Sequence, residues 1–206
     1  MWTWTALDSD SKMILAYEVG DRTAMTAIEF MDDLRTRLAN RVQLTTDGHK
    51  AYLEAVEGAF GADVDYAQLV KLYGEDKNVG PERKYSPSVC KGAKKQVVEG
   101  SPDKAAISTS HVERQNLTMR MGMRRFTRLT NAFSKKLENH LHMLSLYFVH
   151  YNFCRIHKAH KVSPAMAAGV TDTLRDVEWI VSLIDARAPK PGPRGPYKKR
   201  PAENSK

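Results

Sequence analysis

The chain has 206 residues, enough for one domain with a sizeable core, and its formal net charge of +8 favours a polyanionic partner. No apolar run approaches the roughly 20 residues of a membrane span, and the first residues lack the apolar stretch of a signal peptide. The two cysteines, Cys90 and Cys154, form no CxxC pair, so we expect a cytoplasmic protein that is not anchored in a membrane.

The first 60 residues alternate between strand and helix patterns. Aromatic residues and threonines alternate at the start, and a run of Asp and Ser residues then separates them from a second apolar run, which is typical of a β-hairpin. Thr23 precedes a segment with apolar residues every three or four positions, as an N-cap precedes an amphipathic helix. We therefore expect a hairpin, a helix, a strand and a second helix at residues 2–7 with 13–19, 24–38, 42–46 and 51–60.

The strand expected at residues 42–46 ends at Asp47, and Gly48 follows it. A glycine at this point lets the backbone turn sharply into the next helix. Asp47 is therefore predicted at the C-terminal end of a strand.

The second half of the chain is predicted to be mainly helical. Residues 61–104 have no clear periodicity, so we treat them as an insertion packed on the core, and a short apolar strand at residues 105–109 precedes a helix. Helical spacing returns at residues 131–157, and Ser163 with Pro164 opens a short helix. The expected division is a main domain at residues 1–170, a C-terminal helix at 171–188 and a disordered, basic, proline-rich tail at 189–206.

The helix that begins near residue 110 combines one acid with many basic residues. Glu113 is the only acid between Asp103 and Glu138. At about 100° per residue, Arg120 and Arg124 fall on the Glu113 face if the helix runs that far. A carboxylate beside guanidinium groups suits a metal-assisted reaction on a nucleic acid, although a solvated basic helix with Glu113 at its positive end explains the same pattern. The candidate DNA-binding residues are Arg114, Asn116, Arg120, Arg124, Arg125, Arg128, Lys135 and Lys136.

Four motifs resemble transposases of the insertion sequence 1 family, which are DDE-type enzymes. The motifs are TTDGHKAY at residues 45–52, TSHVERQNL at 109–117, FTRLTNAFSKK at 126–136, and YNF with RIH at 151–157. The resemblance covers about residues 2–170. It implies an α/β, ribonuclease H-like core with a helical C-terminal half, which cuts and joins DNA.

The resemblance also implies the chemistry of the site. In such enzymes two Asp residues and one Glu hold two divalent ions, usually Mg²⁺, that activate the attacking hydroxyl and stabilise the leaving oxygen. Asp47 matches the second Asp and Glu113 the Glu, so both are expected to be catalytic and metal-binding. The expected partners are the ends of a mobile element and its target DNA in the nucleoid, and homo-oligomerisation is left open.

The first catalytic Asp of the family has no clear match in this chain. It would lie on a central strand before the Trp-Thr-Trp-Thr segment, so we expect a core that lacks its first strand and a chain that is a truncated or partial copy. Asp8 is an alternative for this acid, but it follows the first strand and also fits a plain turn residue. Three functions stay open: a transposase, an inactive DNA-binding product that regulates transposition, and a ribonuclease H-like nuclease unrelated to mobility.

Overall fold

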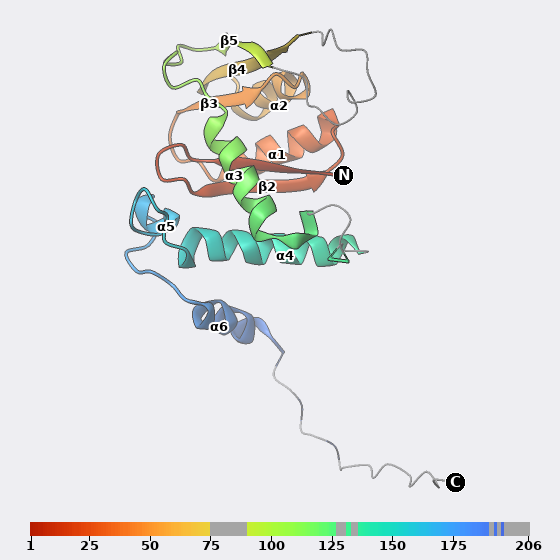
Figure 1. Cartoon of the computed structure of the whole chain (residues 1–206), viewed down its shortest axis with the longest axis vertical. Helices are drawn as coiled ribbons and strands as arrows, with labels where there is room; N and C mark the ends of the chain where they lie inside the picture. The colour runs from red at the N-terminus through yellow and green to blue at the C-terminus, as the bar shows by residue number, and fades with distance from the viewer. Residues whose placement is uncertain (75–89, 127–130, 133–135, 190–191, 193–194, 196–206) are drawn as a thin grey trace, which may run out of the picture.

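A β-hairpin and a three-stranded sheet, covered by helices, make up a mixed α/β fold (Figure 1). The computed structural model describes residues 1–74, 90–126, 131–132, 136–189, 192 and 195. The α/β class expected from the sequence is confirmed. The elements of the N-terminal half are β1 (Trp2–Leu7), β2 (Ile14–Gly20), α1 (Ala24–Thr36), β3 (Val42–Asp47), α2 (Ala51–Phe60), β4 (Val64–Tyr73) and β5 (Cys90–Glu99).

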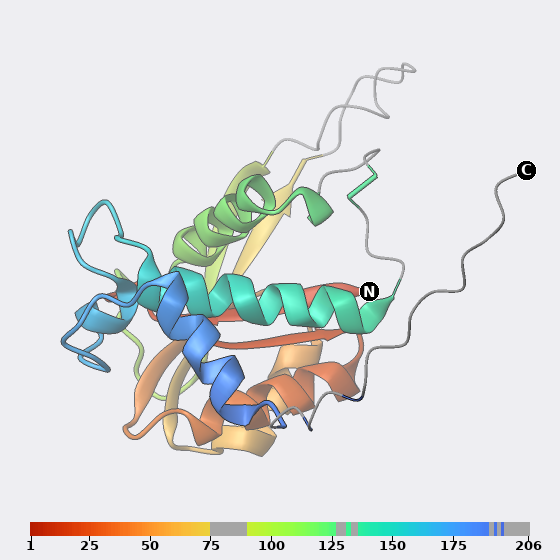
Figure 2. The same ribbon diagram turned by 90° about the horizontal axis from the view of Figure 1, so that it is seen from below.

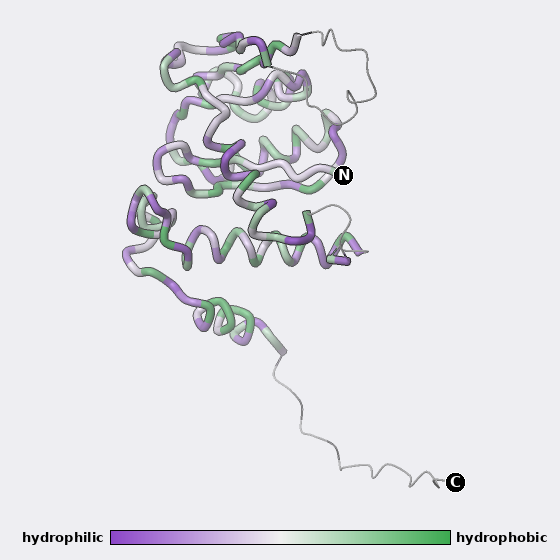
Figure 3. Tube along the Cα trace, in the orientation of Figure 1, coloured by the Kyte–Doolittle hydropathy of each residue, from purple (hydrophilic) through white to green (hydrophobic). Residues whose placement is uncertain are grey.

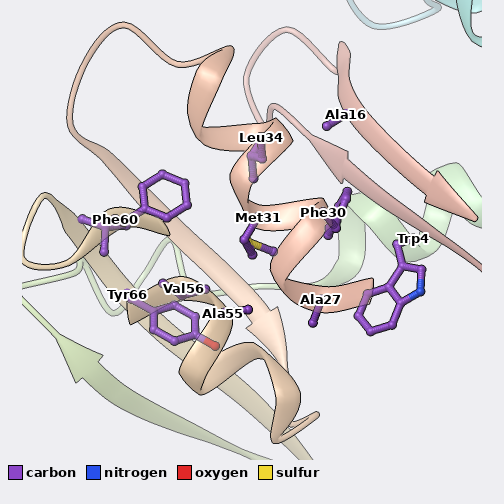
Figure 4. Packing of buried hydrophobic residues seen from close by; sticks show 11 residues of the cluster. Trp4, Ala16, Ala27, Phe30, Met31, Leu34, Ala55, Val56, Phe60 and Tyr66 are labelled. Carbon is purple, nitrogen blue, oxygen red and sulfur yellow. The ribbon is translucent and has the colours of Figure 1, made fainter. Parts of the chain in front are cut away.

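The predicted elements of the first 60 residues are all present. β1 and β2 pair antiparallel, and the Thr23 side chain caps α1 by accepting a hydrogen bond from the Thr26 backbone N–H. The apolar faces of α1 and α2 then form one core cluster with the hairpin and the sheet (Figure 4). Its fully buried members include Ala27, Phe30, Met31, Leu34, Val56 and Tyr66.

β4, which lies within the segment 61–104 that we expected to be an insertion, builds part of the core. β4 lies between β3 and β5, parallel to β3 and antiparallel to β5. Val64, Tyr66 and Ala67 of β4 are buried, so this strand is covered on both faces. A strand buried on both faces lacks the alternation that marks a half-buried strand, which is why its pattern was ambiguous.

The C-terminal half is helical, as predicted, but its helices begin and end at other residues. The helices are α3 (Ser110–Gly122), α4 (Leu137–Val149), α5 (Pro164–Ala167) and α6 (Val177–Arg187), with a 3₁₀ turn at Arg124–Phe126 and a π-helical turn at His150–Cys154. The strand expected at residues 105–109 is wrong, because the described backbone there forms a turn that buries Ile107.

α3 ends at Gly122, so it does not reach Arg124. The backbone of Met123 is extended, and its side chain is buried in a second core cluster with Met119, Leu144 and Tyr147. A Cβ atom on Gly122 would lie 3.3 Å from the Tyr147 ring, so the glycine lets α3 approach α4 closely. Burial of Met123 therefore decides where the basic helix stops.

The hairpin contributes residues to both core clusters, and α4 crosses it in the view from below (Figure 2). α1 and α2 pack on one side of it, and α3 and α4 pack on the other. The buried Asn152 side chain fixes the π-helical turn after α4 to β2. Its Oδ1 accepts from the Ile14 N–H at 3.0 Å, and its Nδ2 donates to the Ile14 carbonyl at 2.9 Å.

The last described helix, α6, contains many apolar residues (Figure 3). Val177, Val181 and Ile184 are exposed, and the Phe153 ring packs against the Trp179 ring at 5.3 Å. Most of the predicted tail, residues 189–206, lies outside the described residues. None of the described helices is both long and apolar enough to cross a membrane.

Candidate functional site

A groove of about 1100 Å³ separates β1 from β3, and α3 runs along it. All six residues of β1 and all six of β3 line the groove, together with apolar residues of α1 and polar residues of α3. Asp47 and Glu113 both line it, although they lie far apart in the sequence. The two acids matched by the resemblance therefore face one cavity.

Asp47 occupies the last position of β3, as the sequence predicted, and its side chain is exposed. Its Oδ1 accepts a hydrogen bond from the His49 N–H at 3.1 Å. Gly48 keeps the turn close to β4, because a Cβ atom there would lie 3.1 Å from a Val70 methyl group. The turn thus orients Asp47 through one carboxylate oxygen.

Glu113 lies in the first turn of α3 and has two donors on one oxygen. Its Oε1 accepts from Thr109 Oγ1 at 2.6 Å and lies 2.6 Å from the Nζ of Lys71. Burial alone would raise the pKa of Glu113, but these two hydrogen bonds and the charge of Lys71 together lower it below its usual range. Glu113 is therefore held ionised, with its Oε2 free of these contacts.

Lys71 is the site residue that sequence reasoning missed. It lies on β4, within the segment that we expected to be an insertion, so nothing in the sequence placed it beside Glu113. The hydrogen bond to Glu113 raises the pKa of Lys71 above its ordinary value. If residues 64–73 had been recognised as a strand, Lys71 would have been expected near the end of the sheet, close to α3.

Asp47 and Glu113 offer the carboxylate oxygens that a hard divalent cation prefers, but they form a small ligand set. Oxygen donors are the ligands that Mg²⁺ prefers, and Mg²⁺ commonly takes one or two carboxylates and completes its shell with water and phosphate. Among the described residues, no group of three or more His, Cys, Asp and Glu side chains is placed to hold a metal. Asp47 and Glu113 are therefore the candidate metal ligands.

Asp8 makes the contacts of a turn residue. Its carboxylate accepts hydrogen bonds from the Asp10 N–H, the Ser11 N–H and the Ser11 hydroxyl in the hairpin turn. Asp8 also lines the groove, but it follows the C-terminal end of β1. The part of β1 near Asp47 is at Trp4, whose ring packs 5.8 Å from the ring of His49. At about 3.3 Å per residue, the four steps from Trp4 to Asp8 span about 13 Å.

We expect Asp8→Ala to lower the free energy of unfolding by about 1 kcal/mol at pH 7, the usual effect of removing a side chain that caps backbone N–H groups. Burial raises the pKa of Asp8, but the hydrogen bonds from Ser11 and Asp10 outweigh it and leave the pKa below the ordinary 3.8. This stabilisation is therefore complete above pH 3.8 and is lost as the pH falls through the lower folded-state pKa. Urea unfolding at several pH values measures the difference, and Asp10→Ala is the control. A difference that persists in strong acid would contradict the assignment.

The predicted DNA-binding residues fall into three groups. Arg114 and Arg120 are exposed on α3, whereas Arg124 and Arg125 belong to the 3₁₀ turn after it, and Lys136 is exposed before α4. Asn116 instead contacts the hairpin, because its Oδ1 accepts from Thr5 Oγ1 at 3.2 Å. Arg128 and Lys135 lie outside the described residues.

The exposed basic side chains and the two groove acids thus share α3 and its surroundings. Arg120 follows Glu113 by seven residues, which places both on one face of the helix. A phosphate backbone lying along this face would meet the Arg120 guanidinium group and the Glu113 carboxylate. Comparisons of the chain with protein-family models, with curated proteins and with solved structures give no match.

Proposed function

We propose that this chain is a DDE-type transposase of the insertion sequence 1 kind, with a ribonuclease H-like core. Its activity would be metal-dependent cleavage and strand transfer of DNA. The observation that carries the proposal is the convergence of Asp47, from the end of β3, and Glu113, from the start of α3, on one groove. The four motifs of the resemblance add support because two of them contain these acids.

The chain's own residues have defined tasks in this proposal. Asp47 and Glu113 hold the divalent ions, which when bound activate a hydroxyl and stabilise the leaving oxygen of a phosphodiester. The His49 N–H and the Thr109 hydroxyl orient the two carboxylates. Arg114 and Arg120 contact the phosphates of the DNA and set its position relative to the acids.

A second candidate is a DNA-binding product that regulates transposition without chemistry of its own. Two metal ions carry about +4 of charge, and Asp47 with Glu113 supplies −2, part of which Lys71 already balances. In this second candidate function the chain binds DNA and a divalent ion but cleaves little or not at all. We propose that the protein associates with the DNA of the nucleoid.

We expect isothermal titration calorimetry to detect Mn²⁺ binding to the purified chain. Asp47→Asn and Glu113→Gln should each weaken this binding at least tenfold, because each removes one of two anionic ligands. Asp8→Asn is the control and should leave it unchanged. Binding that is insensitive to Asp47→Asn and Glu113→Gln would end the proposal.

The same proteins, incubated with supercoiled plasmid and Mg²⁺, test the chemistry. The wild-type chain is expected to shift the DNA in a gel and to nick it little. Nicking that is fast and that Asp8→Asn abolishes would make Asp8 the third acid. The absence of any DNA shift at low salt would contradict both candidate functions.

A further inference from the structure

Three alternate residues of β4 face the turn that follows β3. Tyr66 and Gln68 are only 1% and 4% exposed. Val70 lies against the turn itself, since a Cβ atom on Gly48 would be 3.1 Å from a Val70 methyl group. Side chains alternate along a strand, so these three residues share one face of β4, and this face supports the turn.

The Gln68 amide is buried at a position where the sheet itself needs no polar group. A strand that is covered on both faces is usually rich in Val, Ile and Leu. Burying an amide there costs free energy unless the amide makes its hydrogen bonds. The partners of the Gln68 amide therefore identify what this side chain does.

The amide nitrogen of Gln68 is directed at the turn. Nε2 donates to the Tyr66 hydroxyl at 2.9 Å, with longer contacts of 3.4 Å to the His49 carbonyl oxygen and 3.5 Å to Thr46 Oγ1. The His49 carbonyl can only accept, so the nitrogen of the amide, and not its oxygen, faces the turn. Thr46 Oγ1 also lies 2.8 Å from the Tyr66 hydroxyl and donates to the Asp47 carbonyl at 3.0 Å.

The hydrogen bonds of this network run in one direction. Each hydroxyl has one hydrogen to donate, and Thr46 donates its hydrogen to the Asp47 carbonyl. Tyr66 therefore donates to Thr46 and accepts from Gln68. Burial raises the pKa of Tyr66, and the negative charge of Asp47 adds to this effect, so the Tyr66 hydroxyl keeps its hydrogen at neutral pH.

The network reaches the backbone on both sides of Gly48. One end bonds to the Asp47 carbonyl, and the other contacts the His49 carbonyl. Between these two points the His49 N–H donates to Asp47 Oδ1 at 3.1 Å. A shift of the turn would therefore move the Asp47 carboxylate.

We propose that Gln68 is a positioning residue for Asp47, which sets the direction of this carboxylate by holding the backbone of the turn. The inference rests on the proposed function, in which Asp47 holds a divalent ion. Lys71 lies on the opposite face of β4, because it is three residues further on, and it contacts Glu113. One strand thus supports both candidate metal ligands.

The test replaces Gln68 with methionine, which has a similar volume and no amide. Mn²⁺ is the probe, and isothermal titration calorimetry measures its binding. We expect Gln68→Met to weaken Mn²⁺ binding about tenfold, the usual effect of removing a group that orients a metal ligand. In a chain that already carries Asp47→Asn, the same replacement should have no further effect, because Gln68 acts through Asp47.

The motion of the backbone gives a second readout that needs no metal. Amide order parameters from ¹⁵N relaxation are about 0.85 in a rigid backbone and below about 0.6 in a flexible one. We expect the Gly48 and His49 amides to be rigid in the unchanged chain and flexible in Gln68→Met. Thr46→Val removes the hydroxyl that bonds to the Asp47 carbonyl, so it should loosen the same two amides. This variant decides the question if Gln68→Met does not fold.

Val64→Ala is the matched control. Val64 is fully buried in the same strand, but it pairs with Val42 at the other end of β3. Val64→Ala should therefore leave both the Mn²⁺ affinity and the order parameters of the turn unchanged, even if it lowers stability.

The positioning role is overturned if Gln68→Met binds Mn²⁺ as tightly as the unchanged chain, or if it weakens binding equally in the Asp47→Asn background. It is also overturned if the Gly48 and His49 amides stay rigid, or if Val64→Ala has the same effects. If the unchanged chain does not bind Mn²⁺, the proposed function fails instead, and the order parameters alone decide whether Gln68 holds the turn.

Discussion

Replacing Asn152 with alanine is expected to lower the free energy of unfolding by about 2–4 kcal/mol, which combines two lost hydrogen bonds with the cost of leaving buried groups unpaired. The Asn152 amide accepts from the Ile14 N–H and donates to the Ile14 carbonyl at the first residue of β2. Asn152 and Ile14 are both buried, so water cannot replace the amide. Urea unfolding followed by circular dichroism measures the change.

Asn116→Ala is the matched control, because among the described residues the half-buried Asn116 side chain bonds to Thr5 alone. Its loss should cost less than about 1 kcal/mol. Equal effects of Asn116→Ala and Asn152→Ala would show that the Asn152 amide does not hold the helices to the hairpin.

Changing Arg114, Arg120 and Arg124 together to alanine is expected to weaken DNA binding on unrelated sequences and to flatten its salt dependence. Each phosphate contact adds roughly 0.9 to the log–log slope of affinity against salt, so three lost contacts reduce it by about three units. All three side chains are exposed and lie on α3 or in the turn directly after it. Fluorescence anisotropy at several salt concentrations measures the slope.

The matched control removes the same charge from another exposed surface. Lys91, Lys94 and Lys95 are exposed on β5, so their replacement by alanine also lowers the net charge by three. If DNA contacts the three arginines, the lysine variant should keep the salt-dependence slope of the unchanged chain. A reduced slope in the lysine variant with an unchanged slope in the arginine variant would place DNA on β5.

The sequence predicted well where one face of an element is buried and the other is not. The hairpin, α1, β3 and α2 follow from alternation or helical spacing, and the position of Asp47 at a strand end follows from them. Thr23 and Ser163 cap their helices as local chemistry predicts. These features depend on residues that are neighbours in the sequence.

The features that the sequence did not reveal depend on distant contacts. β4 is buried on both faces, so its pattern carried no alternation and Lys71 could not be placed beside Glu113. α3 ends before Met123, whose side chain is buried against residues of α4. This burial depends on where α4 lies, and the local sequence does not show that. The basic residues after Gly122 are consequently outside the helix on which we expected them.

The hairpin's position between the two core clusters has a consequence for cooperativity. Trp4 and Ala16 belong to the cluster with α1 and α2, while Ile14 belongs to the cluster with α3 and α4. An isolated two-stranded hairpin is marginally stable in water, so β1 and β2 persist because both clusters hold them. Melting of either cluster removes one support of the hairpin and exposes the other cluster to water. The two halves of the chain should therefore unfold together in a single transition.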